Sequence, residues 1–196
     1  MDLFPAFIKL ADRRVVVVGG GPVAASKLEA LLNAGADITV VAPEIVSEIR
    51  NSRVKILERD FRLSDLDGAW LVVAAATLDV NRTVSQAAES RHIFVNAVDD
   101  PPNASLYLGG VVRRAGVTFA ISTDGRAPAL AGLLREALDS LLPTRDLEQW
   151  MAKAAQLRRH WKKDAVPMQN RRPELLQSLI RLYKKPNSKP ITNQLR

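Results

Sequence analysis

The chain has 196 residues, 47% of them hydrophobic, and no cysteine. This length allows a substantial core in one large domain or in one domain with a smaller appendage. The lack of cysteine excludes disulfides, thiolate catalysis and cysteine-ligated metal. No apolar run approaches the roughly 20 residues that span a bilayer, and the start of the chain lacks the basic cluster of a signal peptide. We therefore expect a cytoplasmic protein with no membrane partner.

The net charge of +7 is unevenly distributed along the sequence. Residues 151–196 contain twelve lysines and arginines against Asp164 and Glu174, whereas the rest of the chain is slightly acidic. A basic segment of this kind indicates either a polyanionic partner, such as nucleic acid or a substrate with many carboxylates, or simply a solvated helical face.

The first predicted unit is a strand, a glycine turn, a helix and a second strand. The valines of 15–18 form a short β-branched run that is typical of a parallel strand covered on both faces. Glycines 19–21 follow, the apolar residues of 24–32 recur at helical spacing, and 38–41 is again strand-like. The whole has the size of one βαβ crossover.

The glycine turn predicts a dinucleotide site. Glycine lets the backbone approach a pyrophosphate, and the following helix points its free N–H groups at the phosphates. Gly19 and Gly21 occupy the first two positions of the G-x-G-x-x-G/A fingerprint, and Ala24 occupies the third. The alternative is a glycine turn that binds no nucleotide. After the second strand, Glu44 or the main chain would hold the ribose, and the absence of an arginine there favours NAD over NADP.

The next elements continue the α/β alternation. We predict a short helix at 44–50, a strand at 54–57, a turn at 64–67, a strand at 70–75, a helix at 81–91 and a strand at 93–96. Two apolar runs, 105–112 and 117–122, then predict a β-hairpin. Helical periodicity follows from Pro128 to residue 142, over 147–159 and over 173–183. The first residues, including Phe4 and Phe7, would pack on the sheet edge or beside the cofactor.

Fold class and domain boundaries follow from this order of elements. We expect a Rossmann-like parallel sheet in residues 1–112, a hairpin and helix segment in 113–145, a basic helical domain in 146–184 and a disordered tail in 185–196.

Two later stretches carry polar groups at strand ends. Asp99 follows a predicted parallel strand, where a carboxylate could take a proton from a substrate; the alternative is a simple Asp-Pro turn. Ser122 and Thr123 end a strand before a helix, so their hydroxyls would cap that helix or, with Arg126, bind an anionic substrate. The two histidines lack a second ligand at metal-binding spacing, which predicts no permanent metal site.

Five stretches together resemble the precorrin-2 dehydrogenase module of siroheme biosynthesis, in this order and spacing: VVVVGGGPVAASK (15–27), ITVVAP (38–43), WLVVAAAT (70–77), FVNAVDDP (94–101) and FAISTDGRAPALAGLLRE (119–136). The resemblance extends from residue 1 to about residue 183. It implies NAD-dependent oxidation of precorrin-2 to sirohydrochlorin, and bifunctional relatives also insert Fe²⁺ into the product.

The resemblance also implies roles for individual residues. Asp99 would be the catalytic acid–base, and Thr123 stands where relatives have a serine that lines the substrate cleft. The implied NAD contacts are Gly21, Pro22, Val23, Pro43 and Glu44, with Thr77 and Asn96 as weaker candidates.

Assembly and division of labour are implied in the same way. The resemblance implies a homodimer whose interface includes the leucines of 130–142, and methylation by another protein because the chain ends at residue 196. Two alternatives stay open: a non-enzymatic NAD sensor whose basic tail binds nucleic acid, which we do not favour, and a tetrapyrrole-binding protein without turnover.

Overall fold

The computed structural model describes residues 3–183, which divide into two compact units. The first unit comprises 1–109 and 122–128, and the second comprises 110–121 and 129–196. The predicted tail at 185–196 lies outside the described residues.

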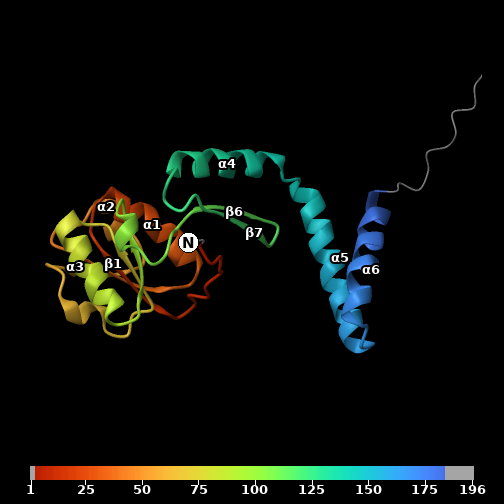
Figure 1. The fold of residues 1–196 in the computed structure, drawn as a ribbon, viewed down its shortest axis with the longest axis horizontal. Coiled ribbons are helices and arrows are strands. Elements are labelled where there is room, and N and C mark those ends of the chain that lie inside the picture. Colours follow the sequence, from red (N-terminus) through yellow and green to blue (C-terminus); the bar gives the residue numbers. More distant parts are fainter. Residues whose placement is uncertain (1–2, 184–196) are drawn as a thin grey trace, which may run out of the picture. The chain divides into compact units, whose positions relative to one another are not determined.

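The first unit is built on a five-stranded parallel sheet in the order β3-β2-β1-β4-β5 (Figure 1). Its elements are β1 (Arg14–Val18), α1 (Pro22–Asn33), β2 (Asp37–Ala42), α2 (Ser47–Arg50), β3 (Lys55–Glu58), η1 (Leu63–Leu66), β4 (Leu71–Ala74), α3 (Leu78–Glu89), β5 (Phe94–Ala97) and η2 (Pro101–Asn103). The predicted Rossmann-like fold is confirmed.

Alternation along the strands produces two hydrophobic layers, one on each face of the sheet. Val15 and Val17 of β1 pack with the buried side chains of α1 and α2. Val16 and Val18 pack on the opposite face with η1 and α3. All four valines are almost fully buried, as the β-branched run predicts for a strand covered on both faces.

The second unit contains the predicted hairpin and the helical segment. The hairpin pairs β6 (Gly110–Arg114) with β7 (Val117–Ile121) in antiparallel register. It is followed by α4 (Pro128–Leu141), α5 (Thr144–Lys163) and α6 (Met168–Tyr183). Arg114 ties the hairpin to α4, because its guanidinium donates to the Asp139 carboxylate at 2.7 Å and to the Leu142 carbonyl at 3.2 Å.

Several predicted boundaries were wrong. Helix α3 begins three residues before 81, and α6 begins at Met168 and contains Pro173, where we had placed the start of the helix. Phe4 and Phe7 are 91% and 73% exposed, so they pack neither on the sheet nor beside the cofactor site.

The predicted hairpin strand at 105–112 begins only at residue 110. Residues 105–106 have a different use. The amides of Ser105 and Leu106 both donate to the Val95 carbonyl, at 2.9 Å, along the outer side of β5.

Candidate functional site

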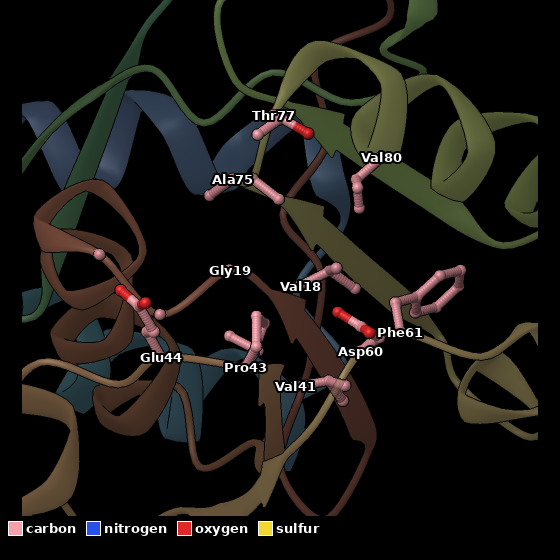
Figure 2. Close-up of a pocket in the computed structure, with 14 residues that line it drawn as sticks. Val18, Gly19, Val41, Pro43, Glu44, Asp60, Phe61, Ala75, Thr77 and Val80 are labelled. Carbon is pink, nitrogen blue, oxygen red and sulfur yellow. The ribbon is translucent and has the colours of Figure 1, made fainter.

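A cavity of about 430 Å³ opens at the carboxyl end of the sheet in the first unit (Figure 2). Its walls come from the β1–α1 turn, the end of β2, the segment after β3 and the end of β4 with the start of α3. Strands β1 and β4 are neighbours that run outward in opposite chain order, which is the switch point where doubly wound sheets bind ligands. Its volume lies within the range of small-molecule and cofactor sites.

The three glycines of the turn have different structural reasons. At Gly19, φ is +126° and a Cβ would lie 2.2 Å from the Ala75 carbonyl oxygen. At Gly20, a Cβ would meet the Glu44 carbonyl oxygen, so this glycine is needed for close packing. At Gly21, no atom lies within 4 Å of the Cβ position, which opens on free space at the cavity wall.

Gly21 is also the N-cap residue of α1, and no side chain caps this helix end. Pro22 has no N–H, and the amides of Val23 and Ala24 lie in the first turn, where no intrahelical acceptor exists. The first turn contains no acidic residue. The helix end thus offers N–H donors and a positive dipole to an anion, beside a glycine whose missing Cβ leaves room for it.

The structure gathers most of the predicted cofactor residues around this cavity. Gly19, Gly21, Pro43, Glu44 and Thr77 all line it. Pro22 and Val23 lie in the adjoining first turn of α1.

Asn96 is placed differently. Its side chain is buried and donates from Nδ2 to the Leu106 carbonyl at 3.0 Å, and it is not among the cavity-lining residues. It thus holds the chain that covers β5.

Sequence reasoning missed one wall of the cavity, which Asp60 and Phe61 form just after β3. This segment is fixed by Arg59, whose guanidinium donates two hydrogen bonds to the Asp65 carboxylate, at 2.6 and 2.9 Å, and one to the Asp60 carbonyl. The Arg62 amide also donates to Asp65. These hydrogen bonds, with that of Arg59 the largest, hold the pKa of the Asp65 carboxyl below its usual value.

Asn81 is a second residue that the sequence did not reveal. It is 2% exposed, and its Oδ1 accepts a hydrogen bond of 2.9 Å from the Ala76 amide, which fixes the turn after β4. An asparagine inside a helical pattern gives no signal of this role by itself.

Asp99 follows β5, next to the strand whose end lines the cavity. Ala97 of β5 pairs with Ala74 of β4, so Asp99 and Ala76 each come two residues after a paired position. Asp99 is exposed, has a left-handed backbone with φ of 56°, and makes no hydrogen bond or ion pair with any of residues 3–183. Its neighbour Asp100 instead accepts a hydrogen bond from Asn103 at 2.8 Å.

The predicted substrate residues form a turn in the same unit. The Thr123 hydroxyl accepts a hydrogen bond from the Ala127 amide at 3.3 Å, and the Ser122 hydroxyl accepts one from the Asp124 amide. Both hydroxyls therefore order the entry to α4, whereas the Arg126 side chain is 81% exposed and pairs with Asp124.

This turn is packed against the segment that follows Asp99. A Cβ on Gly125 would lie 3.2 Å from Pro101 and from the ring of Tyr107. The candidate substrate residues and the candidate base are thus attached to one another through Gly125.

Among residues 3–183, no group of three or more histidine, cysteine, aspartate or glutamate side chains is placed to hold a metal ion. Within the same part of the chain, no helix is both long and apolar enough to cross a membrane.

The fold and the cavity define a class of protein. A doubly wound parallel sheet with a glycine turn, an uncapped helix end and a cavity at the switch point is the arrangement of dinucleotide-binding proteins. Residues 6–110 match the family described as "Putative NAD(P)-binding", and the chain belongs to this family.

Curated relatives are longer than this chain. A siroheme synthase of Citrobacter koseri is 44% identical over 177 residues, which are 88% of this chain and 38% of the relative. Siroheme synthase 3 of Aeromonas hydrophila is 45% identical over 148 residues, 73% of this chain and 32% of the relative. The chain therefore spans little more than a third of the relatives that it matches.

A solved structure shares the fold over most of the chain. The structure titled "SirC, precorrin-2 dehydrogenase" covers 91% of this chain and 100% of its own, with a TM-score of 0.65 and 23% identity.

Proposed function

We propose that this protein oxidises precorrin-2 to sirohydrochlorin with NAD as the hydride acceptor. The observation that carries the proposal is the placement of Asp99: an unpaired carboxylate on a left-handed backbone, beside the strand whose end lines the dinucleotide cavity. Left-handed conformations of non-glycine residues are uncommon and concentrate at functional sites. The names of the siroheme synthases and of the SirC structure support the same substrate.

The cavity residues fit the dinucleotide in a defined direction. The space at Gly21 and the first turn of α1 suit the pyrophosphate. In this fold the acidic residue that binds the adenosine ribose follows β2, so the adenosine half lies toward β2 and β3. The nicotinamide half then extends toward β4 and β5, where Asp99 follows its strand.

NAD, when bound, supplies the acceptor for the two electrons and one hydrogen that leave the tetrapyrrole. The protein must then remove a proton from the substrate, and the free carboxylate of Asp99 is the group placed for it. Asp100 is less suited, because its carboxylate already accepts a hydrogen bond from Asn103. Arg126, exposed in the turn that packs near Asp99, can attract the carboxylates of the substrate.

The proposal extends to assembly as a homodimer in the cytoplasm. Leu130, Leu133, Leu134 and Leu141 of α4 are 46% to 77% exposed although they are large and apolar. Their spacing of three, four and eleven residues places them along one face of the helix. A second copy of the chain would cover this face.

The experiment is anaerobic turnover of precorrin-2 with NAD⁺, followed by absorption spectroscopy. Asp99→Asn should lower kcat by about 10²- to 10⁴-fold, which is the usual contribution of a general base. Asparagine tolerates the left-handed backbone, so the fold should be retained. Asp100→Asn is the matched control and should keep most of the turnover.

Two outcomes would count against the proposal. Precorrin-2 binding without any NAD⁺ reduction by the wild type would favour the tetrapyrrole-binding alternative. Full activity of Asp99→Asn would remove Asp99 as the base. Adding Fe²⁺ to the product tests, in the same assay, whether the chain accelerates iron insertion as bifunctional relatives do.

A further inference from the structure

Asp60 is the carboxylate that the structure brings into the cofactor cavity without a sequence motif to announce it. It comes two residues after the end of β3, lines the cavity and is exposed to it. Figure 2 shows its carboxylate between Val41 and Val80, beside the Phe61 ring. This carboxylate has no hydrogen bond or ion pair with any other residue that the structure describes; only the Asp60 main-chain carbonyl is used, by Arg59.

The position of Asp60 is fixed by its neighbours in sequence. Arg59 on one side and Asp65 on the other join in a two-bond ion pair, in which the Asp65 side chain is only 7% exposed. The Arg14 guanidinium adds a hydrogen bond to the Asp65 carbonyl at 3.1 Å. Asp60 therefore projects from a short loop whose two ends are tied together, and its carboxylate is held at the cavity without being used by the fold.

The charge of the cavity wall has one sign. Glu44 and Asp60 are its ionisable residues, and no lysine, arginine or histidine lines it. The nearest cation in the loop, Arg59, is occupied by Asp65. The two phosphates of a dinucleotide can lie at the end of α1, away from these carboxylates, but a third phosphate near Asp60 would face negative charge with no cation to bind it.

We propose that Asp60 makes the cavity selective for NAD over NADP: its carboxylate accepts hydrogen bonds from the adenosine ribose hydroxyls and repels the 2′-phosphate that NADP carries there. The inference rests on the proposed function only in placing a dinucleotide in this cavity. In many doubly wound folds the acid that contacts the ribose follows β2; here it comes from the adjacent strand, β3.

The test measures binding of NAD⁺ and NADP⁺ to the full chain by calorimetry, without any turnover. The variants are Asp60→Asn, Glu44→Gln and, as a matched control, Asp79→Asn. Asp79 lies in the first turn of α3 with a side chain 97% exposed, and it does not line the cavity.

The ratio of the two dissociation constants is the readout. Asp60→Asn should reduce the preference for NAD⁺ by about 10- to 100-fold, mainly by tighter binding of NADP⁺, since one charge is removed at close range. Asp79→Asn should leave the ratio unchanged. In the wild type, added salt should improve NADP⁺ binding relative to NAD⁺ because it screens the repulsion, and this salt effect should shrink in Asp60→Asn.

The failures can be told apart. If the wild type binds neither dinucleotide, the cofactor of the proposed function is wrong and this inference is overturned with it. If the wild type prefers NAD⁺ and Asp60→Asn keeps that preference, only the role of Asp60 is overturned. A change of ratio in Glu44→Gln alone would assign the selectivity to Glu44 instead.

Discussion

Gly20 and Gly21 are adjacent, yet replacing each by alanine should damage different properties of the protein. At Gly20 the added Cβ would collide with the Glu44 carbonyl and would lie 2.9 Å from the Ile45 side chain. Because the carbonyl is main chain, a backbone shift is required. Gly20→Ala should therefore lower the free energy of unfolding by about 3 kcal/mol, the upper end of the usual overpacking cost.

At Gly21 the Cβ would meet nothing within 4 Å, and φ of −88° suits any residue. Alanine is a poorer N-cap residue than glycine, by roughly 0.5–1 kcal/mol. It also restricts the unfolded chain, which stabilises the fold by about 0.4–1 kcal/mol. The two effects offset each other, so Gly21→Ala should unfold within about 1 kcal/mol of the wild type.

Binding should show the reverse order of damage at Gly21. Its Cβ would fill the space where a pyrophosphate reaches the end of α1, and one lost charge-assisted hydrogen bond is worth about 1.5–3 kcal/mol. The dissociation constant for NAD⁺ should then rise by about 10- to 150-fold.

Thermal unfolding by circular dichroism and calorimetric titration with NAD⁺ measure the two properties. Gly20→Ala should melt about 6–12 °C below the wild type for a chain of this size, and Gly21→Ala should melt close to it. The reasoning is refuted if Gly21→Ala melts as low as Gly20→Ala, or if Gly21→Ala binds NAD⁺ as tightly as the wild type.

Two further predictions concern acid stability and assembly. Arg59 lowers the pKa of Asp65, so this carboxyl stabilises the fold above its unfolded-state pKa, and that stabilisation is lost as pH falls through the folded-state value. Urea unfolding midpoints measured below pH 5 should therefore fall less steeply with acid in Asp65→Asn than in the wild type; equal slopes would contradict this. In light scattering, Leu133→Glu should shift the chain toward monomer if α4 forms the dimer interface, whereas the exposed control Glu136→Gln should not; a dimer that persists in Leu133→Glu would place the interface elsewhere.

The sequence predicts those parts of the fold that depend on local pattern. The valines of β1 and the glycine turn define the opening βαβ unit because period, turn chemistry and helix spacing all agree there. The end of β5 is predicted for the same reason, and with it the place of Asp99.

The missed parts depend on contacts between residues that the pattern does not connect. Asp60 lines the cavity because Arg59 pairs with Asp65 and because β3 lies beside β2, and neither fact is visible in a local window. Asn96 sits at the right edge of the sheet, but Leu106 takes its amide. Pro173 looks like a helix start, whereas α6 gains one and a half turns before it.

The chain that runs along β5 has a consequence for solubility. An uncovered edge strand offers its N–H and C=O groups to any other strand and is a template for aggregation. Here Ser105 and Leu106 occupy the Val95 carbonyl, and the Ser105 hydroxyl accepts from the Val95 amide. The opposite edge, β3, is only four residues long and carries the charges of Lys55 and Glu58. One edge of the sheet is thus capped by the protein itself and the other is short and charged, so two copies can meet through a helical face without their sheets joining.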